Sequence, residues 1–197
     1  MSLHALQRFA FTRRLLLKLA APRAQESVDH FGHLLRNGET ILDIGAGICD
    51  ITQVLQSRGY TVTALDVQDF SYVPGIHPVL YDGTKMPFAD QQFDTAIILT
   101  VLHHTTHPEA VLDEALRVAK RVIITEDIYS NSLHKYLTFG MDSLLNLEFF
   151  GHPHSNKTDE QWQALFAREG LRLTRYKAWG SFLVLRHRMY VLQKNSD

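Results

Sequence analysis

The chain has 197 residues, of which 45% are apolar and 21% are charged, which is the composition of one ordinary globular domain. A disordered or collagen-like chain is therefore excluded, and the net charge of −1 gives no global attraction to nucleic acid. The single cysteine, Cys49, excludes an internal disulfide and favours a reducing, cytoplasmic location. No apolar run approaches the roughly 18 residues that a membrane span needs.

The first 25 residues are basic, with five Arg and Lys and no acid. Their apolar spacing predicts an amphipathic helix that Pro22-Arg23 closes, followed by a second helix over residues 24–36. The leucines after Arg14 resemble a twin-arginine export signal, but Lys18 interrupts them after three residues, which favours the helix. We expect it to pack on the core with a basic outer face rather than to rest on an anionic membrane.

From residue 40 onward, strands and helices alternate. Five strands are expected, over residues 40–44, 60–66, 78–81, 93–100 and 121–125. One helix ends near Gly59 and another has Pro108 in its first turn. This alternation predicts a parallel sheet with helices on both faces, which binds ligands at the carboxyl ends of its strands.

After residue 128 the pattern changes. Thr158 and Gln161 predict a capped helix, and strands over residues 171–179 and 182–193, joined by Gly180-Ser181, predict an antiparallel hairpin at the sheet edge. The expected fold class is therefore α/β, a Rossmann-like doubly wound, mostly parallel seven-stranded sheet with an antiparallel terminal hairpin and helices on both faces. We expect a single domain whose parts are N-terminal helices (1–37), a cofactor-binding core (38–128), an insert (129–157) and a final helix with two strands (158–197).

The most informative motif is the turn Asp43-Ile44-Gly45-Ala46-Gly47, directly after the first core strand. Glycines there let the backbone turn sharply and approach a ligand closely. Asp66 ends the next strand, where a carboxylate can bind both hydroxyls of a ribose. A dinucleotide fingerprint would place a third glycine at position 50. Asp50 stands there instead and would face a pyrophosphate, which disfavours an NAD-linked oxidoreductase.

Over about residues 38–127 the chain resembles the class I S-adenosylmethionine-dependent methyltransferases, in particular the small-molecule branch. The matching segments are residues 41–47, 64–66, 82–88, 93–94 and 101–104. The resemblance implies S-adenosyl-L-methionine as cofactor and methyl transfer to a small-molecule acceptor. Cys49 stands where the family often has a third glycine, and we expect it to be a small buried filler rather than a reactive thiol.

The resemblance also implies which residues contact each part of the cofactor. The amino-acid end of the cofactor would contact Asp43 and the turn Gly45-Ala46-Gly47, and the ribose would contact Asp66, with Val67 beside it. The adenine would contact Asp82 and Gly83, and the methionine portion would contact the backbone near Thr100.

Candidate catalytic bases follow the fourth and fifth strands. They are His103 or His104, and Asp127 or its neighbour Glu126. A base that removes a proton from the acceptor accelerates transfer by about 10² to 10⁴. We expect one histidine to contact the acceptor and Asp127 to lie close to it; the alternative is that one histidine caps the helix near Pro108 and the other faces solvent. Histidines at 103, 104 and 107 allow a metal by spacing, but we expect none because a matched ligand set is missing.

Two further functions stay open. A non-catalytic S-adenosylmethionine-binding protein would have the same cofactor residues. A nucleic-acid methyltransferase is disfavoured by the neutral charge balance and by Thr100-Val101-Leu102-His103, where an amino-methylating enzyme has an Asn-Pro-Pro-Tyr-type motif. Residues 129–154 fall where the family inserts a substrate lid, and their aromatic and apolar content suggests an acceptor with a ring or an aliphatic body. The oligomeric state is not predicted.

Overall fold

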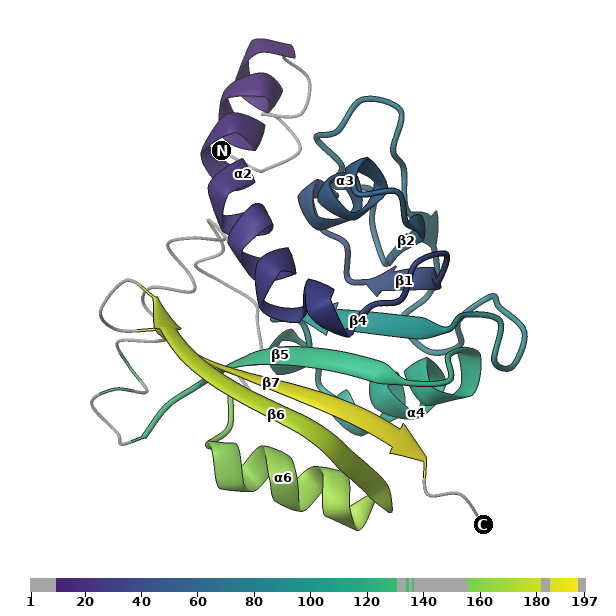
Figure 1. Cartoon of the computed structure of the whole chain (residues 1–197), viewed down its shortest axis with the longest axis vertical. Helices are drawn as coiled ribbons and strands as arrows, with labels where there is room; N and C mark the ends of the chain where they lie inside the picture. The colour runs from purple at the N-terminus through teal and green to yellow at the C-terminus, as the bar shows by residue number, and fades with distance from the viewer. Residues whose placement is uncertain (1–9, 131–133, 135, 137–155, 182–184, 195–197) are drawn as a thin grey trace. The chain divides into compact units, whose positions relative to one another are not determined.

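A seven-stranded mixed sheet forms the framework of the protein (Figure 1). The structure is a computed structural model that describes residues 10–130, 134, 136, 156–181 and 185–194. The strand order is β3-β2-β1-β4-β5-β7-β6, and it confirms the predicted fold class. The strands are β1 (Thr40–Ile44), β2 (Thr61–Asp66), β3 (Val79–Leu80), β4 (Thr95–Leu99), β5 (Val122–Ile128), β6 (Leu171–Ser181) and β7 (Leu185–Lys194).

The helices are α2 (Ala10–Phe31), α3 (Asp50–Ser57), α4 (Pro108–Val118) and α6 (Asp159–Arg168), with short 3-10 turns η1 (Gly32–Leu34) and η2 (Leu102–His104). By its contacts the chain forms two compact units. The first comprises Met1–Ile97 with Arg117–Lys120, and the second comprises Ile98–Leu116 with Arg121–Asp197. Most of the predicted insert at 129–157 lies outside the described residues.

In the first unit, β1, β2 and β3 pair in parallel. The side chains of Ile41, Leu42 and Ile44 are buried, as expected of a central parallel strand that is covered on both faces. Helix α2 contacts α3 within this unit. Because β2 and β3 run parallel to β1, their carboxyl ends lie at the same edge as the glycine turn that follows β1.

The predicted helix break at Pro22-Arg23 is wrong, because α2 continues through Pro22 as one helix. Proline removes one backbone hydrogen bond and strains the preceding turn. Tertiary contacts offset that cost. Ala24, Val28 and Phe31 are buried at helical spacing, and Asp29 accepts a 2.5 Å hydrogen bond from the guanidinium of Arg58 after α3.

In the second unit, β7 pairs antiparallel with both β5 and β6, which confirms the predicted terminal hairpin. Two predicted boundaries are wrong. The fifth strand continues to Ile128 rather than ending at 125, because β7 pairs along its whole length. Gly180-Ser181 pair with Arg186 and Leu185 inside the ladder, so they belong to β6 rather than to the turn.

The start of α6 matches its prediction. The Thr158 hydroxyl accepts a hydrogen bond from the Gln161 amide at 3.3 Å, and the Gln161 side chain accepts one from the Thr158 amide at 2.9 Å. This reciprocal capping box satisfies two amides that the helix itself cannot. The capping box fixes the residue at which α6 begins, and α6 contacts the hairpin strand β6.

Candidate active site

The turn after β1 is built from backbone conformations that favour glycine. Gly45, Gly47 and Cys49 have φ of +71°, +52° and +62°. The amides of Gly45 and Ala46 donate to the Leu65 carbonyl at 2.8 and 3.2 Å, which ties the turn to the end of β2. A Cβ atom added at Gly47 would meet no atom within 4 Å, so a ligand can approach this backbone closely.

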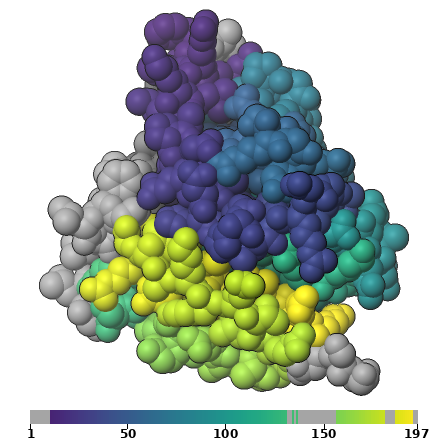
Figure 2. All heavy atoms as spheres, in the orientation of Figure 1, coloured from purple at the N-terminus to yellow at the C-terminus, as the bar shows by residue number. Residues whose placement is uncertain are grey.

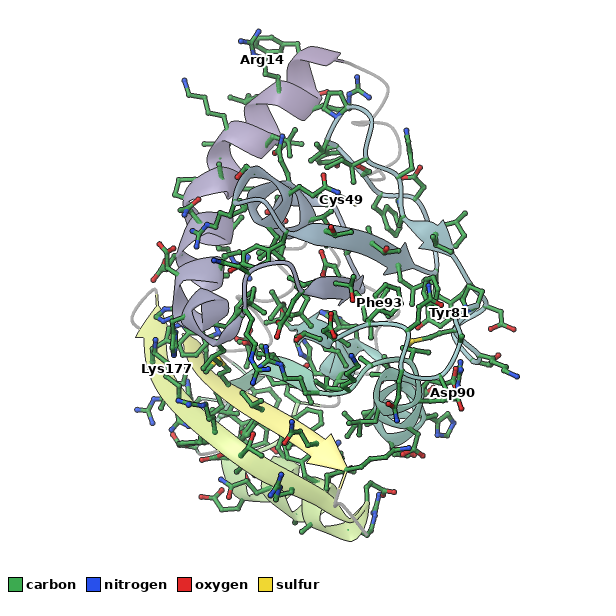
Figure 3. All side chains as sticks on the ribbon, turned by 45° about the vertical axis from the view of Figure 1, so that its right-hand side comes forward. Arg14, Cys49, Tyr81, Asp90, Phe93 and Lys177 are labelled. Carbon is green, nitrogen blue, oxygen red and sulfur yellow. The ribbon has the colours of Figure 1, made fainter. Side chains whose placement is uncertain are left out.

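Cys49 occupies the third left-handed position of this turn and is completely buried (Figure 3). A left-handed backbone costs a non-glycine residue roughly 1–2 kcal/mol. Burial raises the pKa of the thiol to about 12, so it stays protonated and unreactive near neutral pH. The prediction of a small buried filler is confirmed.

Asp66 connects the glycine turn to the end of β2. Its Oδ2 accepts from the Gly47 amide at 2.8 Å and its Oδ1 from the Val67 amide at 2.7 Å. Oδ1 also accepts from the Gln68 amide at 3.4 Å. A carboxylate has about four acceptor sites, so these three bonds leave acceptor capacity for a hydroxyl. The backbone carbonyl of Asp66 accepts a hydrogen bond from the Tyr81 amide at 3.2 Å. The loop that begins after β3 therefore lies next to the carboxyl end of β2.

The residues that follow β2 and β3 place an exposed apolar side chain near a carboxylate. Val67 is 51% exposed, and a Cβ added at Gly83 would lie 3.6 Å from its Cγ1 atom. Next to Gly83, Asp82 Oδ1 accepts from the Thr84 amide and hydroxyl at 2.9 and 2.6 Å, which lowers the pKa of Asp82. An ionised acceptor therefore stands beside an exposed apolar side chain, as an adenine ring with its amino group requires.

The glycine turn is acidic. Asp43 is buried and accepts a 2.6 Å hydrogen bond from the Thr52 hydroxyl. Burial is the largest cause that raises the pKa of Asp43 to about 7, and the charges of Asp50 and Asp66 raise it further. Burial also raises the pKa of Asp50, although the charge of Arg23 opposes this. The site therefore favours a ligand with positive charge and disfavours a pyrophosphate.

In the second unit, Glu126 organises the segment after β4. Its Oε1 accepts from the amides of Val101 and Leu102 at 3.2 and 2.8 Å, and its Oε2 lies 2.6 Å from His103 Nδ1. Both side chains are completely buried. Just before them, Thr100 has a φ of +56° and donates its amide to the Thr125 carbonyl at 2.7 Å. The turn that follows β4 is thereby fixed to β5.

The two candidate histidines differ in surroundings. His103 is held by Glu126, whereas His104 is partly exposed and its ring lies 4.1 Å from that of His103, centre to centre. His107 is exposed and lies 3.5 Å from Glu109. In the part of the chain that the structure describes, no group of three or more metal-binding side chains is gathered.

Asp127 has a partner that the sequence analysis did not find. His187 on β7 lies directly opposite in the antiparallel register, and its Nδ1 is 2.5 Å from Asp127 Oδ1. The His187 ring is also 5.4 Å from that of Trp179 on β6. The structure thus pairs His103 with Glu126 and Asp127 with His187. Only the register of the hairpin could have indicated the second pair.

Comparison with known proteins agrees with this geometry. Residues 42–122 match the family described as "Methyltransferase domain". This segment is similar to the members of that family. It contains the glycine turn, Asp66, Asp82 and both candidate histidines, but not Asp127 or the hairpin.

Solved methyltransferases share the fold over most of this chain. A SAM-dependent methyltransferase from Methanosarcina mazei superposes with a TM-score of 0.66 at 17% identity, over 85% of this chain and 97% of that one. Magnesium protoporphyrin IX methyltransferase from Synechocystis PCC 6803, solved with bound SAH, gives 0.60 at 16% identity, over 90% and 83%. The fold is therefore that of the S-adenosylmethionine-dependent methyltransferases.

Among curated proteins, demethylmenaquinone methyltransferase from Clavibacter sepedonicus is 34% identical over an alignment of 101 residues, and the match covers 45% of this chain and 41% of the relative. The chain spans about two fifths of the length of the first curated relatives it matches. In the described part of the chain, no helix is long and apolar enough to cross a membrane.

Proposed function

We propose that this protein transfers a methyl group from S-adenosyl-L-methionine to a small organic acceptor. The acidic glycine turn is the observation that carries the proposal. The charges of Asp50 and Asp66 both act on the buried Asp43, beside an open glycine backbone. S-adenosylmethionine has an ammonium group and a sulfonium, whereas the pyrophosphate of NAD would meet these carboxylates unfavourably.

The residues of the first unit fit three parts of this cofactor. Asp43 and the backbone of 45–47 would hold the amino-acid end, and Asp66 would accept hydrogen bonds from the ribose hydroxyls. Val67 and Gly83 would pack against the adenine, with Asp82 accepting from its amino group. When bound, the cofactor supplies an activated methyl group, so the protein has to orient the acceptor, exclude water and remove a proton where necessary.

Residues that follow β4, and residues of β5 and β7, would handle the acceptor. The left-handed Thr100 would present backbone to the methionine portion. His104, which is the partly exposed histidine, and Asp127 with its partner His187 are the proposed groups for moving a proton. His103, being buried against Glu126, would position this segment.

As acceptor class we propose a phenol or quinol, because curated relatives are demethylmenaquinone methyltransferases. The hydroxyl of such a ring loses its proton to a base of this kind.

We further propose a cytoplasmic location, no nucleic-acid partner and a single-domain organisation. A lone buried cysteine suits a reducing compartment, and the net charge of −1 offers no field for nucleic acid. A non-catalytic cofactor-binding protein is the alternative that activity measurements decide.

Calorimetry tests the cofactor. S-adenosylhomocysteine should bind at micromolar concentrations and NAD should not. Asp66→Ala should weaken binding at least about tenfold, since charge-assisted hydrogen bonds contribute about 1.5–3 kcal/mol each. Asp69→Ala, an acid on the loop after β2, is the matched control and should change affinity little. Binding of NAD in place of S-adenosylhomocysteine would contradict the proposal.

Transfer of labelled methyl from the cofactor to a panel of quinols then tests the activity. Cofactor binding without methyl transfer to any phenol, quinol or other small acceptor would favour the non-catalytic alternative.

A further inference from the structure

We propose that the first half of α2, residues 10–20, is a docking surface for an anionic membrane. This inference is independent of the proposed function, because it concerns a surface that no cofactor residue shares. It departs from the expectation that the basic N-terminal helix packs on the core with a basic outer face rather than rests on an anionic membrane. The second half of α2 packs against its unit, whereas the first half packs through Leu17 and exposes apolar side chains on the opposite side.

An apolar row runs along the exposed side of this half. Phe11, Leu15 and Leu19 follow one another at intervals of four residues and are 78%, 47% and 68% exposed. Side chains four apart lie on one face of a helix. Large apolar side chains scattered singly on a surface need no explanation, but a row on one helix face marks an interaction site.

The row faces away from the core of its own unit. Leu17 packs against the buried cluster of Ala46, Cys49, Ala64 and Val73. At about 100° per residue, Leu15 and Leu19 lie roughly 160° from Leu17, and Phe11 roughly 120° from it. The first half of α2 is therefore apolar on two opposite sides, of which only one is used by the unit. In the view of Figure 2 this part of α2 presents uncovered atoms.

Basic side chains flank the row. By the same rotation, exposed Arg14 and Lys18 lie on one side of it. Exposed Arg23, one turn further along, lies on the other side, where its charge also acts on Asp50. Arg14 is labelled at the start of the helix in Figure 3. Residues 10–25 contain no Asp or Glu. Apolar residues bordered on both sides by Lys and Arg are the pattern of a helix that lies in the surface of an anionic bilayer.

Charge decides which partner fits. A second copy of this helix would bring like charges against Arg14 and Lys18, with no acid in the segment to pair with them. Anionic lipid headgroups offer the opposite charge beside hydrocarbon for Phe11 and the leucines. The second half of α2 stays attached to its unit through the buried Val28 and Phe31, so the exposed half can lie on a bilayer without unfolding.

Sedimentation of the full chain with vesicles tests the proposal. The protein should bind vesicles of phosphatidylcholine with phosphatidylserine, and bind those of phosphatidylcholine alone at least about tenfold more weakly. Leu15→Ser with Leu19→Ser should lower the partition coefficient on anionic vesicles by about tenfold or more. Arg14→Gln with Lys18→Gln should lower it by about tenfold on anionic vesicles only.

Matched controls come from the outer strand β6. Leu173→Ser replaces an exposed leucine there, and Arg172→Gln with Arg175→Gln removes two exposed charges. These variants should bind as the parent does, and circular dichroism should show every variant folded. Absence of vesicle binding, equal losses in the controls, or a concentration-dependent dimer that Leu15→Ser with Leu19→Ser dissociates would each overturn the proposal.

Discussion

At the scale of single residues, we expect Asp43 to link cofactor binding to pH. The pKa of its carboxyl is raised from 3.8 to about 7, chiefly because burial penalises the charged form. The folded state therefore holds a proton that the unfolded chain loses above its own pKa. The contribution of Asp43 to the free energy of unfolding is fully present below about pH 4. It falls by up to about 4 kcal/mol as pH rises towards 7. Asp43→Asn should flatten this part of the stability–pH profile in urea titrations.

Cofactor binding should release this proton. A positive ammonium beside Asp43 favours the ionised carboxylate, so affinity for S-adenosylmethionine should increase as pH rises from about 6 to 8. Calorimetry near pH 6.5 in phosphate and in imidazole should give different heats, because the buffer takes up the released proton. The same heat in both buffers would show that Asp43 does not face the cofactor's ammonium, and Asp43→Asn provides the reference in which the difference disappears.

At the scale of elements, the connection from β4 to α4 depends on Glu126. One buried carboxylate accepts from two backbone amides and pairs with His103. Glu126→Ala leaves these groups buried without their acceptor, so it should destabilise the fold by about 3–5 kcal/mol in urea unfolding. Glu126→Gln keeps an amide oxygen as acceptor and should cost less.

Glu109 is the control for this element. It lies in the first turn of α4, beside exposed His107. Glu109→Ala should change stability by less than about 1 kcal/mol, because exposed pairs contribute little. If Glu126→Ala were as mild as Glu109→Ala, the buried pair would not be what holds the turn.

At the scale of the whole molecule, we expect cofactor binding to raise the melting temperature of the protein. A ligand that binds only the folded state stabilises it by about 2.7 kcal/mol at a hundredfold excess over its dissociation constant. For a chain of this size, that corresponds to a rise in melting temperature of roughly 5–10 °C. S-adenosylhomocysteine should produce this rise in a thermal shift assay and Asp66→Ala should diminish it. A shift with NAD alone would point to a different ligand.

The sequence by itself determined the features that depend on short-range chemistry. The parallel core strands, the glycine turn, the capping box at Thr158 and the terminal hairpin were all predicted, because hydrophobic period, turn residues and caps act within a few positions. The resemblance to the methyltransferases implied that Asp43, Asp66 and Asp82 contact the cofactor. The open backbone at Gly47 and the acidic surroundings of Asp43 support that assignment.

Only the tertiary structure decided what depends on partners distant in the chain. Pro22 does not end α2, because packing of Val28 and Phe31 outweighs one lost hydrogen bond. Glu126 and Asp127 lie inside β5 rather than after it, because β7 pairs beyond them. Their pairing with His103 and His187 follows from side chains alternating across a strand and from a hairpin register that local sequence does not encode. Propensity acts within a turn or two, whereas these contacts are fixed by burial and register.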